Sequence, residues 1–330
     1  MNICDINTNI QVIRLLSLFS PGSATTMNQL AVRDRSNYHD GSKHDLSDTP
    51  LRSVERFMFT APLAGLPTQV MVEGKPMTCG PNLMAREAAI VYCLASGLSP
   101  RSFPRDYLRI DRKRAIIVAS LYDHLESMPQ DLETQASYEA LVSETLAQWQ
   151  IIKATGLRVE YNPTSDGHPD PYANPRLLIS DVLENNHLFV TETRLAFGST
   201  PHGSENAVLE NPLLREVIGE QISGRVPLVN DILRVVHDYF GHVREGLGFR
   251  VHGEYNAWRG HLAMYSSLAA RALTTEMLGQ NFWVNFGPLG ELNRKADVSE
   301  THYAEQKVGL LPVWVAEWIV CGTKGGDFDT

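Results

Sequence analysis

The chain has 330 residues, of which 43% are hydrophobic, and a formal net charge of −9. This composition is typical of a globular protein with a sizeable core, and its basic residues form no cluster longer than Arg112 to Arg114, so nucleic-acid binding is not expected. No apolar run reaches the roughly 18 residues that a membrane span needs. The four cysteines form no C-x-x-C pair, which argues against a disulfide framework or a thiolate zinc site and favours a reducing, cytoplasmic location; they are Cys4, Cys79, Cys93 and Cys321.

Three regions follow one another along the chain. Residues 1–50 are broken in pattern and include a polar stretch, so we expect a flexible or loosely packed arm. Residues 51–150 form a helical N-terminal region, and residues 151–330 form a metal-binding catalytic region. The predicted fold is mainly α (α+β), with a few short strands. Apolar residues recur at helical spacing in three segments of the first half: Pro81 to Leu98, Arg114 to Leu125 and Ser137 to Thr155.

The second half alternates loops with helices. Prolines, glycine and aspartates predict a loop at Asn162 to Pro175, and a second loop is expected at Gly198 to Asn211. A strand is expected at His187 to Thr193, where β-branched and aromatic residues gather. An apolar run at Leu310 to Val320 predicts an edge strand or a segment entering the core. Helices are expected at Arg176 to Glu184, Pro212 to Ile222, Pro227 to Arg244 and Glu254 to Leu278.

The segment most suited to chemistry is His237-Asp238-Tyr239-Phe240-Gly241-His242, continued by Val243-Arg244-Glu245-Gly246-Leu247. On an α-helix a spacing of five separates the two imidazoles by roughly 140° and about 7.5 Å, a gap that histidine side chains can close around one metal. The i,i+4 histidine spacing of zinc peptidases is missing. A glycine between the two histidines costs about 1 kcal/mol in a helix and indicates close approach of a substrate or a second helix. The alternative is a pair of ordinary surface or core histidines.

A third ligand is expected from the following helix. One face of that helix carries Glu254 and Glu276 together with His261 and apolar residues. A carboxylate on such a face is costly to bury unless it meets a cation, so both glutamates are candidate ligands, although either could instead lie in solvent at a helix end. His252 and His261 are weaker candidates. Two histidines and one carboxylate form a facial triad, which suits Fe(II) and O2 chemistry better than zinc.

The same segment resembles the iron-binding helix of the pterin-dependent aromatic amino acid hydroxylases, whose pattern H-[DE]-x-[FL]-G-H-[VC] is matched by residues 237–243. Shorter matches follow the family's order, so the resemblance covers roughly residues 155–318. It implies a helical catalytic domain in which Fe(II), held by His237, His242 and Glu276, activates O2 for hydroxylation. The shorter matches are Thr155 to Arg158, Tyr172 to Arg176, Ala272 to Glu276, Gly290 to Leu292 and Leu311 to Glu317.

The resemblance also bears on the cosubstrate. It places Arg176 and Leu178 at the pterin site, but leucines stand where the family has an aromatic residue that stacks on the pterin, so the electron donor stays open between a reduced pterin and another compound. The family's substrate-binding arginine is also replaced, by Ala196 and Phe197. Three other arginines are alternatives for an anionic substrate group: Arg194, Arg215 and Arg225. Candidate catalytic residues are Tyr239, Glu254 and His261.

The preferred function is therefore a mononuclear non-haem Fe(II) oxygenase that hydroxylates a small substrate, with aromatic compounds as the first class to test. Its expected partners are O2 and that small molecule, without nucleic acid or membrane. One alternative is a metal-dependent HD-type phosphohydrolase built on His237-Asp238 with His187 or His202 as a further ligand. Another is a non-catalytic binding protein on the same scaffold.

Overall fold

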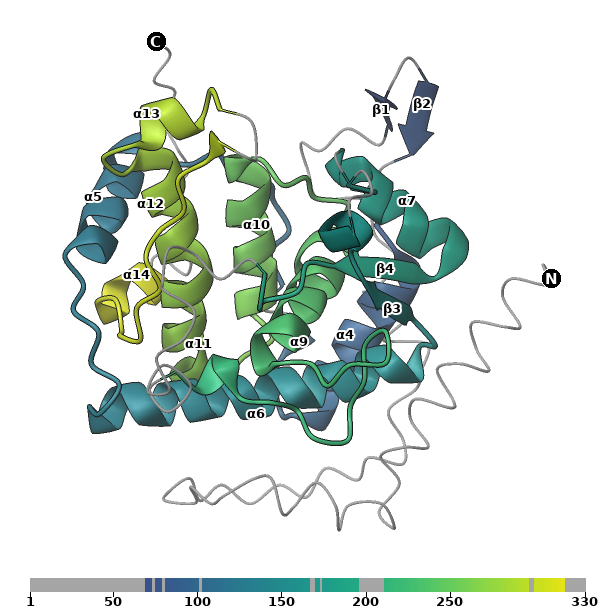
Figure 1. Cartoon of the computed structure of the whole chain (residues 1–330), viewed down its shortest axis with the longest axis horizontal. Helices are drawn as coiled ribbons and strands as arrows, with labels where there is room; N and C mark the ends of the chain where they lie inside the picture. The colour runs from purple at the N-terminus through teal and green to yellow at the C-terminus, as the bar shows by residue number, and fades with distance from the viewer. Residues whose placement is uncertain are drawn as a thin grey trace.

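The computed structural model describes residues 69–72, 75–78, 81–100, 103–166, 170–172, 174–195, 211–296 and 300–317. Helices predominate in these residues, which confirms the mainly helical prediction (Figure 1). The predicted arm at residues 1–50 and nearly all of the predicted loop at 198–211 lie outside the described residues. None of the helices in the described ranges is both long and apolar enough to span a membrane.

The N-terminal helices begin where the sequence supplies a capping side chain. Asn82, Asp111 and Asp131 each accept a hydrogen bond from a backbone N–H of the first helical turn, which satisfies donors that the helix itself leaves unpaired. The helix capped by Asp131 spans about 35 Å and lies along one side of the molecule, at the bottom of the view in Figure 1. These helices are α4 (Leu83–Ala95), α5 (Arg112–Asp123) and α6 (Leu132–Ala154).

Two small sheets accompany these helices. Strands β1 (Gln69–Val72) and β2 (Lys75–Thr78) pair antiparallel. Strands β3 (Arg158–Tyr161) and β4 (His187–Val190) pair in parallel, and the 3-10 turn η3 (Pro163–Asp166) and helix α7 (Pro175–Asn185) lie between them in the chain. The strand predicted at His187 is thus confirmed over its first four residues.

The C-terminal half departs from the predicted long helices. The helix expected from Glu254 to Leu278 is interrupted after Leu262, and Ser266 caps a new helix by accepting from the Ala269 N–H. The helix expected from Pro212 is wrong beyond Leu214, because Gly219, Ser223 and Gly224 adopt positive φ. The observed elements are η4 (Pro212–Leu214), α9 (Val229–Val236), η5 (His237–Val243), α10 (Val251–Leu262), α11 (Ser267–Leu273), η6 (Thr274–Gly279), α12 (Gln280–Phe286) and α13 (Gly290–Asn293).

The edge strand considered for Leu310 to Val320 is also corrected, because the described part of this segment forms the short helix α14 (Val313–Glu317). Val315 of α14 is buried and enters the core, in agreement with the other alternative for this segment. The remaining residues of the run, 318–320, lie outside the described part of the chain.

Buried apolar residues form three main clusters around the centre of the fold. One joins α4, α6 and α7 to α9 and η5; another joins α5, α10, α12 and α14; the third joins α6, α9 and α11. Segments η5 and α10 also contact each other directly. The boundary between the first two clusters therefore passes between η5 and α10, where the predicted histidine motif lies.

Candidate metal centre

The two histidines of the motif lie on a π-helical segment rather than on an α-helix. Within and just after η5, the Arg244 N–H donates to the Tyr239 carbonyl at 3.0 Å and the Leu247 N–H donates to the His242 carbonyl at 2.9 Å. Because a π-helix bonds each residue to the fifth along, His237 and His242 lie about one turn apart on the same side. The 140° separation expected for an α-helix is thereby corrected. In the π-helical form, a spacing of five is favourable for two histidines that bind the same metal ion.

Gly241 allows this segment to pack closely. A Cβ atom at this position would lie 3.0 Å from Nδ1 of His237 and 3.3 Å from Cβ of Ala257 on α10. The close approach of a second helix, predicted from the glycine, is confirmed. The absence of a side chain at Gly241 leaves room for both the His237 ring and α10.

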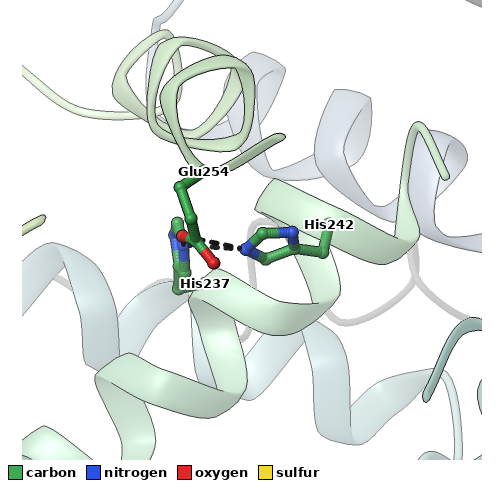
Figure 2. Close-up of side chains that lie close together, drawn as sticks. All are labelled: His237, His242 and Glu254. Atoms are coloured by element: carbon green, nitrogen blue, oxygen red, sulfur yellow. Dashed lines mark hydrogen bonds and ion pairs between the residues drawn. The ribbon is translucent and has the colours of Figure 1, made fainter. Parts of the chain in front are cut away.

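Helix α10 supplies the third side chain, Glu254, from its first turn. Gly253 allows this, because a Cβ atom there would collide with the carbonyl oxygen of Gly248 in the preceding turn. With the helix start pressed against that turn, the Glu254 carboxylate points toward both histidines (Figure 2).

Three atoms form a nearly equilateral triangle. Nε2 of His237 lies 3.2 Å from Nε2 of His242, and Oε2 of Glu254 lies 3.4 Å and 3.3 Å from the same two nitrogens. The centre of such a triangle is about 1.9 Å from each corner, slightly less than the roughly 2.0–2.2 Å of divalent metal bonds to histidine and carboxylate. An ion just outside the plane of the triangle would therefore meet all three atoms at bonding distance.

Burial and neighbouring charges shift the pKa values of all three groups. Burial lowers the pKa of His237 despite its contact with Glu254. At His242, burial acts in the same direction, but the negative charge of Glu254 outweighs it and raises the pKa. Burial alone would raise the pKa of Glu254, yet the two histidines hold that pKa at about 2. Without a metal the site thus combines an ionised carboxylate with a histidine, His242, that binds a proton more tightly than an ordinary imidazole, and a metal ion would compete with that proton.

The second ring nitrogen of His242 is fixed by the turn that follows η5. Nδ1 of His242 donates to the carbonyl of Leu247 at 3.3 Å. Arg176, for which cofactor binding stays a prediction, stabilises this turn by donating to the Gly246 carbonyl at 2.6 Å. The ring of Phe249 packs edge-on against His242 at 4.6 Å. Ligand orientation is thus supported by the surrounding protein.

Glu276, which the resemblance favoured as the third ligand, lies outside the triangle. It belongs to η6, where it accepts hydrogen bonds from the Tyr138 hydroxyl at 2.5 Å and from Nε2 of Gln280 at 2.8 Å. Burial raises its pKa to about 7. The structure corrects the choice between the two candidate glutamates, because Glu254 and not Glu276 groups with the histidines.

Two other predicted site residues belong to the core. Tyr239 and Leu178 are each 1% exposed and lie in the same apolar cluster, so packing accounts for their positions, and the roles expected for them in catalysis and cofactor binding stay predictions. His261 is also buried, but it faces the site: its Nδ1 lies 3.4 Å from Nδ1 of His237. Burial, followed by the charges of His237, Arg244 and His242, holds the pKa of His261 well below its usual value.

The remaining candidates have other partners. Nδ1 of His252 accepts from the Ile110 N–H. The arginines considered for an anionic substrate each pair with glutamates: Arg194 with Glu192 and Glu216, Arg215 with Glu139, and Arg225 with Glu192.

Sequence reasoning missed Gln148 of α6, whose Oε1 lies 3.1 Å from Nε2 of His261. Gln148 is 0% exposed and lies 89 positions before His237, counting from 148 to 237. A single glutamine on an amphipathic helix carries no local signal of such a role. Only the packing of α6 against the C-terminal helices reveals it.

The chain matches no protein-family model, and no curated protein and no solved structure is similar enough to match it. The geometry of the site and the motif of residues 237–243 are therefore the observations that bear on function.

Proposed function

We propose that this protein is a mononuclear non-haem Fe(II) oxygenase whose metal is held by His237, His242 and Glu254. The observation that carries the proposal is the triangle of Nε2, Nε2 and Oε2 atoms, with sides of 3.2, 3.4 and 3.3 Å. Such a donor set of two imidazoles and one carboxylate leaves three positions open on an octahedral ion. Fe(II) would supply the capacity to activate O2.

The three side chains of the triangle differ in their exposure to solvent, which indicates the side from which a substrate can approach. The His242 side chain is 1% exposed, that of His237 is 13% exposed and that of Glu254 is 23% exposed, so the cluster is most open beside the carboxylate. We propose that a small substrate, with aromatic compounds as the first class to test, approaches from this side. Hydroxylation of a C–H bond consumes O2, two electrons and two protons and yields the alcohol and water, so a two-electron organic donor is required. A reduced pterin is one such donor.

The phosphohydrolase alternative has less structural support. His187, one of its candidate ligands, is engaged at both ring nitrogens by Asp181 at 2.7 Å and Glu160 at 2.9 Å. The other candidate, His202, lies outside the described residues. Within the part of the chain that the structure describes, Asp238 does not belong to the group that could hold a metal. The adjacent His-Asp pair that defines that class is thus not assembled around one ion.

A zinc hydrolase remains a specific competitor, because zinc enzymes use the same donor set and tetrahedral zinc would place its ligand atoms about 3.3 Å apart. Anaerobic loading with Fe(II), followed by nitric oxide and EPR spectroscopy, separates the two functions. We expect a high-spin iron-nitrosyl signal from the wild type and from His252→Ala, which removes a histidine of α10 outside the triangle. His242→Ala should give no signal. Retention of zinc with no nitrosyl signal in the wild type would reject the oxygenase.

A further inference from the structure

We infer that Gln148 and His261 are positioning residues that fix the proton of His237 on Nδ1, so that the Nε2 lone pair of His237 is directed into the triangle. The consequence for metal binding rests on the proposed function, whereas the proton position itself is a property of the metal-free protein. The inference concerns side chains on α6 and α10 that do not belong to the triangle.

A continuous row of polar atoms runs from the helix backbone to the site. Nε2 of Gln148 donates to the carbonyl of Met264 at 3.2 Å, and Oε1 of Gln148 faces Nε2 of His261 at 3.1 Å. On the other side of the imidazole, Nδ1 of His261 lies 3.4 Å from Nδ1 of His237. Gln148 and His261 are each 0% exposed, so water does not compete for these contacts.

The donors and acceptors along this row permit one arrangement. The Met264 carbonyl can only accept, so it must face the amide nitrogen of Gln148, and the amide oxygen then faces His261. An oxygen at that position requires a proton on Nε2 of His261. Burial favours a neutral imidazole, whose other nitrogen must therefore accept. That acceptor, Nδ1 of His261, requires the proton of His237 to be on Nδ1.

Packing prevents the row from rearranging freely. The ring of Tyr265 lies edge-on to the His261 ring with centroids 4.9 Å apart, and its hydroxyl bonds to Thr145 of α6 at 2.8 Å. Gly241 lies close to the His237 ring, because a Cβ atom there would stand 3.0 Å from Nδ1 and 3.1 Å from Cε1 of that ring. A flip of either ring would bring two acceptors or two donors together in a buried place, which costs about 1–3 kcal/mol.

The result is the same orientation at both histidines, reached by different means. The backbone carbonyl of Leu247 holds the Nδ1 proton of His242, and the His261–Gln148 pair holds the Nδ1 proton of His237. Both Nε2 atoms are therefore available to one ion. Outer partners of this kind typically change metal affinity by about 10- to 100-fold when they are removed.

The direct test is ¹⁵N NMR of histidine side chains in the metal-free, full-length protein, with signals assigned from single histidine variants. We expect His237 with its proton on Nδ1 and His261 with its proton on Nε2. A proton on Nε2 of neutral His237 in the wild type would overturn the inference, whether or not any variant folds.

A pair of α6 variants tests the cause. Gln148→Met keeps the length of the side chain but removes its amide. Ser137→Ala removes a buried hydroxyl from the same helix, one that donates to the Leu268 carbonyl and does not contact the row. We expect Gln148→Met to give a mixture of His237 tautomers and about 10- to 100-fold weaker Co(II) binding, while Ser137→Ala keeps the wild-type tautomer and affinity. Wild-type tautomers and affinity in folded Gln148→Met would overturn the inference.

The two proposals fail in different ways. If the tautomers are as expected but neither Fe(II) nor Co(II) binds, the proton positions stand and the proposed function fails. If the metal binds while His237 carries its proton on Nε2, the metal site stands and the role of Gln148 and His261 fails.

Discussion

Two π-helical segments in the described part of the chain, η5 and η6, lie at buried acidic sites of opposite character. Near η5, burial would raise the pKa of Glu254, but the two histidine nitrogens that it meets hold this pKa at about 2. In η6, Glu276 receives two hydrogen bonds from Tyr138 and Gln280. The first site gathers atoms that a cation can bind, whereas the second already satisfies its carboxylate.

The comparison shows that local geometry alone does not make a metal ligand. Both segments are π-helical, a conformation that recurs at functional sites, and both carry residues that match one family's motifs. The neighbouring elements make the difference: α10 brings a carboxylate and η5 two imidazoles to one point, while α6 and α12 bring donors to Glu276. The partners of a buried carboxylate thus decide its chemistry.

The largest expected effect comes from replacing each of the two glutamates, one at a time, by alanine. Structural zinc sites with four ligands bind with about 10–16 kcal/mol, so loss of one ligand should cost about 3 kcal/mol, or about 100-fold in affinity. We expect Glu254→Ala to weaken Co(II) or Fe(II) binding by at least this factor and Glu276→Ala to leave it within a few-fold of the wild type. Titration calorimetry on both variants measures the difference.

Circular dichroism provides the control for this pair, since each variant must retain the helical spectrum before affinities are compared. Loss of metal from folded Glu276→Ala, with metal retained by Glu254→Ala, would restore the ligand set implied by the resemblance and reject the triangle.

A second effect, on stability alone, is expected from the glycine of η6. A Cβ atom at Gly279 would lie 2.6 Å from the Tyr122 ring and 3.0 Å from Leu311, both in the core. Overpacking of this kind costs about 1–3 kcal/mol, and replacement of a helical glycine offsets about 1 kcal/mol of this, so Gly279→Ala should lower the free energy of unfolding by about 1 kcal/mol with unchanged metal affinity. Urea denaturation followed by metal titration checks both parts. A strong loss of affinity in the folded variant would show that η6 and the metal site are coupled.

The sequence revealed the histidine motif but not its local geometry. His237 and His242 were identified from their spacing, glycine and apolar surroundings, and the close approach at Gly241 was anticipated. The π-helical form was not, because it depends on how η5 packs between α4 and α10 rather than on the propensity of any one residue.

The third ligand could not be chosen from periodicity. Glu254 and Glu276 lie on one face only if the chain between them is a single helix, and that helix is broken near Ser266. The cap at Ser266 is reinforced by Glu144 of α6, a contact between residues 122 positions apart. Long-range contacts of this kind leave no periodic pattern in the sequence.

A third prediction uses the pKa of Glu276. Its folded pKa is raised from 4.5 to about 7, so the folded protein binds this proton more tightly than the unfolded chain. The resulting stability is fully present below about pH 4.5 and is lost as the pH rises through about 7. Glu276→Gln should therefore nearly match the wild type at pH 4.5 and exceed its free energy of unfolding by about 3 kcal/mol at pH 8.5.

Urea denaturation at the two pH values measures this difference. Glu291→Gln, a change at an exposed glutamate of α13, is the matched control and should show no comparable rise at pH 8.5. An equal difference between Glu276→Gln and the wild type at both pH values would mean that burial does not raise the pKa of Glu276.

The smallest expected effect on stability comes from Gly241→Ala, a change that should alter the metal site more than the fold. In Gly241→Ala, the new methyl group would stand 3.0 Å from Nδ1 and 3.1 Å from Cε1 of the His237 ring. The gain of about 1 kcal/mol from replacing a helical glycine offsets much of the cost of that contact, so thermal unfolding should shift little. The ring must nevertheless move by a few tenths of an ångström away from residue 241, and its Nε2 atom moves with it. We expect the metal affinity of Gly241→Ala to fall about tenfold. Gly279→Ala, the equivalent change in η6, should show the reverse pattern of lower stability and unchanged affinity.

Calorimetric titration and thermal unfolding of the two variants side by side measure this difference. Equal metal affinity in Gly241→Ala and the wild type would show that the site tolerates a displaced His237.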